Sequence, residues 1–366
     1  MNASRTDTGR LRCMPRPSRG VRLLLALSLL TLTGAAGCSS IGYYWQAMRG
    51  QMELVRKSRP IPEVIADSVT EPKLRDTLQQ VTTMREFASR ELALPDNGSY
   101  RSYADLGRPY VVWNVFATEE FSTHAKEWCF PIAGCVGYRG YFSEAAARAF
   151  AQEQEQAGLD VFVGGVPAYS TLGWLDDPVL STFIHYPPTE LARLIFHELS
   201  HQVVYVKGDT TFNESFAVAV ETEGVQRWLR AHGNADMQRA FERWQSRKRD
   251  FVELIERTRA KLDALYREAE VEKAELRQRK AAVFADMRAE YALIKQGWGG
   301  FSGYDGWFAQ PLNNAQLASV ALYTQLVPAF QALLQAHDGD MRGFYAEVER
   351  LSKLPADERN RRLGHR

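Results

Sequence analysis

The stretch His197-Glu198-Leu199-Ser200-His201 decides the fold that we expect, because it reads H-E-x-x-H. On a helix, positions i and i+4 lie on one face, so His197 and His201 can direct two imidazoles at one metal ion. Glu198 is turned partly off that face, where its carboxylate can act as a general base toward water. The pattern therefore predicts a helix that carries two ligands of a catalytic zinc site.

We expect the third ligand on the next helix. Three glutamates follow the motif, namely Glu214, Glu221 and Glu223. Glu214 lies early on the predicted second helix, which a short turn can return antiparallel to the first, so it is the preferred ligand. Glu221 lies seven residues further on roughly the same face, where it could accept a proton from a ligand histidine. The alternative for Glu221 is a glutamate exposed to solvent on the helix surface. The alternative for the whole motif is a pair of histidines at a helix surface that bind no metal.

Other chemistries fit the sequence less well. Lys207 stands six residues after His201, where a third histidine would indicate a metzincin, and the inverted H-x-x-E-H order is absent. No carboxylate pair or phosphate-binding loop supports glycosyl or phosphoryl chemistry. The formal net charge of the 366 residues is +1, so charge gives no reason to expect a nucleic-acid partner.

The N-terminal residues resemble a bacterial lipoprotein signal. An arginine-rich leader precedes an apolar run over residues 23–36, which is too short for a comfortable membrane span. Small residues then precede Cys38, which we predict to be the lipidated first residue of the mature chain. This signal predicts a lipid-anchored protein of the bacterial envelope, on the outer membrane and facing the periplasm. An ordinary signal peptide or an anchor helix is the alternative.

The cysteines are consistent with an oxidising compartment. Cys13 would leave with the signal and Cys38 would carry lipid, which leaves Cys129 and Cys135 as an even pair. The segment between these two residues can turn. We therefore predict a disulfide between them, with two free thiols as the alternative.

The motif and the segment Phe212-Asn213-Glu214-Ser215-Phe216-Ala217 together resemble the glutamate zincins, the group of thermolysin and aminopeptidase N. The N-E-x-F-A element is similar to the segment that supplies the third ligand on the aminopeptidase N side. Twelve residues lie between His201 and Glu214, fewer than is usual in that group, so the connection must be short. The mature chain also resembles a family of bacterial predicted aminopeptidases, many of them lipoproteins. The segments that carry this likeness are Cys129–Phe142, Tyr169–Ser181, the metal motif and Tyr304–Ala318.

The resemblance implies a zinc-dependent peptidase with one Zn²⁺ per chain and a peptide substrate. Glu198 would take the proton of the attacking water and pass it to the leaving amine. A donor for the developing oxyanion is also needed. We predict Tyr304 for this role, with Tyr323 and Tyr205 as second choices. A core or surface tyrosine is the alternative for each.

Several residues are candidates for binding the peptide substrate. Thr171, Leu172 and Gly173 could form an edge strand to which a peptide adds, with an internal strand as the alternative. The acidic groups that could hold a free amine are Asp176, Asp177 and Glu221. No counterpart of the G-x-M-E-N exopeptidase signature is present, so the choice between exopeptidase and endopeptidase stays open.

We expect an α+β fold of zincin-like type, with a small sheet, the active-site helix and the glutamate helix, and mostly helical overall. The motif helix should run to about Val206. We divide the chain into a signal peptide (1–37), an N-terminal helical segment (38–105), a catalytic core (106–234), a charged helical hairpin or arm (235–296) and a C-terminal helical part that completes the catalytic domain (297–366). An arm packed on its own domain is favoured over one that docks a protein partner.

The alternative function is a non-catalytic, zinc-stabilised lipoprotein that binds or scaffolds a partner through this arm. The intact Glu198 argues against it, because a scaffold does not need a general base. The sequence therefore favours an envelope-anchored zinc peptidase.

Overall fold

A computed structural model of the chain describes residues 42–130, 134–268 and 271–364, so Cys38 and the predicted signal lie outside the described residues. The chain divides into two compact units, Met1–Arg49 and Gly50–Arg366. The described part of the first unit is helical. The second unit holds the H-E-x-x-H motif and all the other predicted site residues apart from Cys38.

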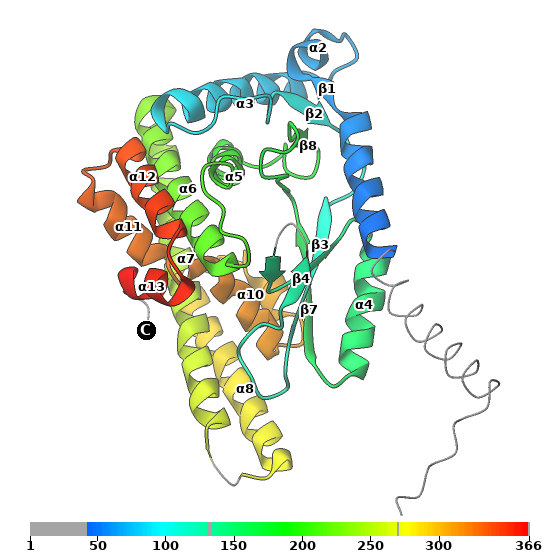
Figure 1. The fold of residues 1–366 in the computed structure, drawn as a ribbon, viewed down its shortest axis with the longest axis vertical. Coiled ribbons are helices and arrows are strands. Elements are labelled where there is room, and N and C mark those ends of the chain that lie inside the picture. The colour runs from blue at the N-terminus through cyan, green and yellow to red at the C-terminus, as the bar shows by residue number, and fades with distance from the viewer. Residues whose placement is uncertain (1–41, 131–133, 269–270, 365–366) are drawn as a thin grey trace, which may run out of the picture. The chain divides into compact units, whose positions relative to one another are not determined.

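The second unit is an α+β fold in which short strands form three small sheets (Figure 1). The strand orders are β1-β2-β8, β6-β3-β7 and β4-β5. β2 and β8 are parallel, whereas the other pairs are antiparallel. The strands are β1 (Arg59–Pro60), β2 (Ser102–Ala104), β3 (Val112–Thr118), β4 (Trp128–Phe130), β5 (Gly134–Val136), β6 (Arg139–Tyr141), β7 (Asp160–Val166) and β8 (Val179–Leu180).

Helices make up most of the unit. They are α2 (Ile61–Ala66), α3 (Pro72–Glu91), α4 (Glu144–Gln156), α5 (Pro188–Ser200), α6 (Thr210–His232), α7 (Ala235–Tyr266), α8 (Lys273–Gly297), α9 (Asp305–Phe308), α10 (Asn314–Thr324), α11 (Val327–Ala336), α12 (Met341–Ser352) and α13 (Ala356–Arg362). The motif lies on α5, and Glu214 lies on α6, which packs closely against α5.

The strand β3 is the best-buried part of the sheets. All its residues are buried, because β6 and β7 flank it and both α4 and α10 pack against it. A central strand without a polar face is expected where helices cover the sheet.

The helix α5 lies within the main hydrophobic core, so the motif stands on a rigid base. Its buried apolar residues are Leu191, Ala192, Leu194, Ile195, Phe196 and Leu199. Phe196 meets Phe87 of α3 with ring centroids 6.1 Å apart. Gly224 lets α6 approach, because a Cβ there would lie 2.7 Å from Cδ2 of Phe196. Side chains locked in this way hold functional groups in place.

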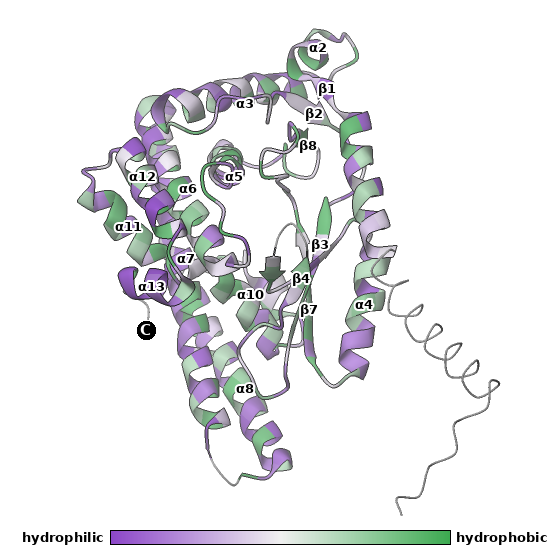
Figure 2. Cartoon of the chain, in the orientation of Figure 1, coloured by the Kyte–Doolittle hydropathy of each residue, from purple (hydrophilic) through white to green (hydrophobic). Residues whose placement is uncertain are grey.

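The predicted arm corresponds to the pair α7 and α8, which pack against each other. Figure 2 shows hydrophilic and hydrophobic residues interspersed along both helices. The buried apolar cluster between them comprises Phe251, Leu254, Ile255, Leu262, Phe284, Met287, Tyr291, Phe308 and Leu317. Phe308 and Leu317 belong to α9 and α10, so the hairpin packs on its own domain.

Residues 314–336 are long and apolar enough to cross a membrane by composition. They form α10 and α11, both of which pack against α6. Gln316 of α10 is fully buried and donates from Nε2 to the carbonyl of Trp307 at 2.7 Å. A buried, hydrogen-bonded glutamine of this kind is typical of a core helix.

Candidate metal centre

His197, His201 and Glu214 form a buried cluster whose potential ligand atoms all lie within 4.8 Å of one another. Nε2 of His197 lies 3.3 Å and Nε2 of His201 lies 3.6 Å from Oε2 of Glu214. Each of the three residues is less than a tenth exposed. Two imidazoles and one carboxylate that converge in this way could hold a metal ion.

The connection between α5 and α6 brings Glu214 to the histidines. The helix α5 ends at Ser200 rather than near Val206, so the predicted helix was too long. The side chain of Asn213 holds Val206 outside the helix: its Nδ2 donates to the carbonyl of Val206 at 2.8 Å, and its Oδ1 accepts from the N–H of Val206 at 2.7 Å. These two bonds satisfy backbone groups outside the helix and fix the residue that precedes Glu214.

The first turn of α6 is secured from a distant part of the chain. Asp209 is its N-cap and accepts from the N–H of Phe212 at 3.0 Å. Arg359 of α13, which is 4 % exposed, donates from Nε to the other carboxylate oxygen of Asp209 at 3.1 Å. Its Nη1 also donates to the carbonyl of Leu354 at 2.9 Å. The cap of the ligand helix is thus itself held in place.

Glu221 holds the other side of the His197 ring. Its Oε2 lies 2.9 Å from Nδ1 of His197 and 3.0 Å from Nη1 of Arg193, and its Oε1 lies 3.5 Å from Nζ of Lys248. Burial raises the pKa of Glu221, but the charges of Arg193 and Lys248 and the bond with His197 lower it well below its usual range. An ionised Glu221 accepts the Nδ1–H, so Nε2 is the nitrogen that faces Glu214 and could bind a metal ion.

The donor set fits a divalent cation. Burial lowers the pKa of His197, but hydrogen bonds with Glu214 and Glu221 raise it more, to about 10. Burial raises the pKa of Glu214, but His201 and His197 lower it to about 2. The cluster therefore favours a positive charge between its ligand atoms. A proton supplies that charge in part, and a bound dication would supply it fully.

Glu198 is placed to act as a base rather than as a ligand. Its side chain is partly exposed and accepts no hydrogen bond from any residue that the structure describes. Burial raises its pKa, the two histidines lower it and Glu214 raises it, with a net rise above the usual value. A carboxylate with a raised pKa and free lone pairs can accept a proton at neutral pH.

Comparison with known families supplies the assignment. The family model described as "Putative aminopeptidase" matches residues 42–363. The chain belongs to this aminopeptidase family. No curated protein and no solved structure matched the chain. The match spans α5, α6 and every residue of the cluster, so the two histidines and Glu214 lie within the region that the family shares.

In this member of the aminopeptidase family, Tyr304, which the sequence analysis proposed as the oxyanion donor, packs against the helical hairpin. Its ring stacks on Phe251 with centroids 4.1 Å apart, inside the cluster of α7 and α8. Burial raises its pKa to about 12, and the charges that act on it are those of Glu190 and Arg193. Neither Glu198 nor Glu214 is among these charges, so these contacts do not support Tyr304 as the oxyanion donor.

The charge of Glu214 affects the pKa of three other tyrosines. Burial and this carboxylate raise the pKa of Tyr138, Tyr205 and Tyr323, and Glu198 acts on Tyr138 and Tyr323 as well. Tyr205 and Tyr323 were second choices from the sequence, whereas Tyr138 was missed. Its position in a Gly-rich stretch after the disulfide was the one signal that could have indicated it.

The predicted substrate strand is a turn, so that prediction was wrong. Leu172 and Gly173 have φ values of +57° and +81°, and the N–H of Trp174 donates to the carbonyl of Thr171 at 3.1 Å. The cause is Asp177, whose buried carboxylate accepts the N–H of Thr171 at 2.9 Å. This bond folds the segment back on itself and leaves no extended edge at these residues.

The disulfide-bonded hairpin lies beside the connection between the ligand helices. Cys129 of β4 and Cys135 of β5 are directly opposite each other and joined by a disulfide. A Cβ added to Gly134 would lie 2.6 Å from the backbone nitrogen of Gly208. The hairpin therefore packs directly on the loop that precedes α6.

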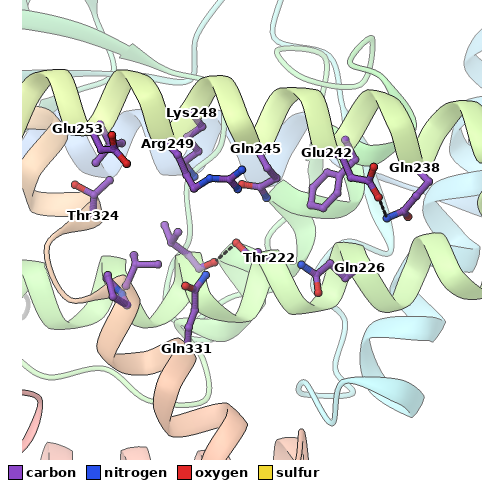
Figure 3. A pocket seen from close by; sticks show the side chains of 15 residues that line it. Thr222, Gln226, Gln238, Glu242, Gln245, Lys248, Arg249, Glu253, Thr324 and Gln331 are labelled. Carbon is purple, nitrogen blue, oxygen red and sulfur yellow. Dashed lines mark hydrogen bonds between the residues drawn. The ribbon is translucent and has the colours of Figure 1, made fainter.

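A cavity of about 690 Å³ lies between α6, α7 and the segment that joins α10 to α11 (Figure 3). Its labelled lining residues include Thr222, Gln245, Lys248 and Gln331. Lys248 also pairs with Glu221, so the cavity borders the residue that supports His197.

The support from Glu221 can be tested. We expect Glu221→Gln to weaken the affinity for a divalent cation, tested with Zn²⁺, by about 10–100-fold, because an amide cannot stabilise the Nδ1–H of His197 as a carboxylate does. Competition with a chromogenic chelator would measure the affinity. Glu223→Gln is the matched control, since Glu223 lies on the same helix but pairs with Arg227. Equal affinities for the two variants would contradict the assigned role.

Proposed function

We propose that this member of the aminopeptidase family is a zinc metallopeptidase that hydrolyses peptide bonds, with His197, His201 and Glu214 as the metal ligands. The observation that carries the proposal is the buried three-residue cluster next to Glu198, whose carboxylate accepts no hydrogen bond from the described part of the chain. A structural zinc site would be closed by four protein ligands, whereas three ligands leave a position for water or substrate.

The roles of the residues follow from their positions. When bound, zinc would supply Lewis-acid activation of the water and of the peptide carbonyl. Glu198 takes the proton of the attacking water and passes it to the leaving amine. Glu221 keeps His197 in the tautomer that presents Nε2. Tyr138, Tyr205 and Tyr323 replace Tyr304 as the candidates for stabilising negative charge on the carbonyl oxygen.

We further propose that the chain is held at the cell envelope through a lipid on Cys38. The support is the arginine-rich leader, the short apolar run and the small residues before that cysteine. The paired Cys129 and Cys135 are consistent with an oxidising compartment. Metabolic labelling with a palmitate analogue would test the anchor, since Cys38→Ala should abolish the label.

The enzymatic proposal is tested with the purified protein and a panel of peptides. We expect one zinc per chain by elemental analysis, hydrolysis of peptides, and loss of hydrolysis after chelation that added zinc restores. Comparing free-amine with N-acetylated peptides would distinguish an aminopeptidase from an endopeptidase. Bound zinc without hydrolysis of any peptide would instead favour the non-catalytic scaffold.

A further inference from the structure

Tyr100 carries a buried hydroxyl that lacks a partner. The residue is 1 % exposed, and its hydroxyl makes no hydrogen bond to the part of the chain that the structure describes. Leaving such a group unpaired costs free energy that a phenylalanine would not cost. A buried orphan hydroxyl therefore needs an explanation other than folding.

The backbone of Tyr100 is held in an unfavourable conformation. Its φ is +61°, in the left-handed region that bulky residues rarely adopt. The surrounding contacts impose this conformation: the N–H of Tyr100 donates to the carbonyl of Asp177 at 2.6 Å, and the fully buried Arg85 donates to the carbonyl of Ser99 at 2.8 Å. Unfavourable backbone conformations that several contacts hold in place are found most often at functional sites.

The loop that carries Tyr100 is fastened to the end of the motif helix. Gln202, which directly follows His201, donates from Nε2 to the hydroxyl of Ser99 at 3.2 Å. The side chain of Asn97 donates to Oε1 of the same glutamine at 2.7 Å. These bonds tie the position of Tyr100 to the position of the metal ligands.

Two carboxylates act on the Tyr100 hydroxyl. Burial raises its pKa well above the usual value, and the charges of Glu198 and Asp177 raise it further. Oδ2 of Asp177 already accepts from the N–H of Thr171 and, at 3.3 Å, from the hydroxyl of Ser170. Gln202, which holds this loop, follows Glu198 by four residues, so the loop is fastened on the side of the motif helix that carries Glu198. Neither the hydroxyl of Tyr100 nor the carboxylate of Glu198 has a hydrogen-bond partner among the described residues.

We propose that Tyr100 is a positioning residue for Glu198: during the reaction its hydroxyl donates a hydrogen bond to the carboxylate and orients it toward the attacking water. Catalytic hydrogen bonds that are long in a ligand-free enzyme shorten when the reacting complex forms. A bond to a charged acceptor is among the stronger ones. This inference rests on the proposed peptidase function.

The test compares Tyr100→Phe with wild type in the full, zinc-loaded protein. We expect kcat for a cleaved peptide to fall about tenfold, because one charge-assisted hydrogen bond to the base is lost. KM and the zinc content should stay the same. The midpoint of denaturant unfolding should stay the same or rise, since the variant removes an unpaired hydroxyl. Tyr103→Phe, three residues away, is the matched control and should keep the wild-type kcat.

The outcomes separate the two proposals. Active wild type with an unchanged kcat in Tyr100→Phe would overturn the positioning role and leave the peptidase intact. A raised KM at constant kcat, or a lower unfolding midpoint or zinc content, would also overturn it, because each indicates a binding or structural role. A zinc-loaded wild type that cleaves no peptide would overturn both proposals.

Discussion

Glu198→Gln is expected to lower kcat by about 10²–10⁴-fold, the contribution that general acid–base catalysis usually makes. The amide has the size of the carboxylate but cannot accept the proton of the attacking water. Glu198 accepts no hydrogen bond within the described chain, so the substitution should leave folding unchanged. It is also not one of the three clustered ligands, so zinc content should stay at the wild-type value. Steady-state kinetics with elemental analysis on the same sample would measure both.

The control for this variant is Glu223→Gln, which removes one negative charge from α6 without touching the cluster. Its kcat should match wild type. Glu198→Gln with wild-type kcat would exclude Glu198 as the base. If kcat falls only in proportion to the zinc content, Glu198 has a structural role at the site and is not the base.

His197→Ala is expected to lower zinc affinity by more than about 100-fold. This loss exceeds the 10–100-fold expected when only the supporting carboxylate of Glu221 is removed. One of the three residues proposed as ligands is lost, and Glu214 and Glu221 lose the imidazole between them. Hydrolysis should disappear with the metal. A ligand that binds only the folded state raises thermal stability, so added zinc should raise the melting temperature of wild type but not of the variant.

The matched control is His185→Ala, because His185 is exposed and lies outside the cluster. It should keep both the zinc-dependent rise in melting temperature and the activity. A His197→Ala protein that still shows the full rise would mean that zinc binds elsewhere.

The parts of the site that the sequence predicted are those set by local periodicity. His197 and His201 are four residues apart on one helix, and a short connection places Glu214 opposite them, as the structure has it. Glu221 follows seven residues later, two helical turns along, and reaches the same histidine from the other side. The α+β class followed from the same local patterns of helix and strand.

The parts that were missed depend on contacts between distant segments. The left-handed Tyr100 is imposed by Arg85 and Asp177, and neither contact can be read from the residues around Tyr100. Asp177 likewise turns the stretch at Thr171, for which the sequence analysis predicted an edge strand. Tyr304 was predicted as the oxyanion donor, but its ring packs on Phe251 of the helical hairpin, a contact that the residues around Tyr304 do not reveal.

The pairing of Arg359 with Asp209 bridges 150 residues of chain. A ribosome adds residues in order, so the helix with Glu214 leaves the ribosome long before the arginine that secures its first turn. A nascent chain therefore secures the first turn of the helix that carries Glu214 only after Arg359 has been synthesised. A nick between the two positions that releases the downstream fragment would undo that step without touching any ligand.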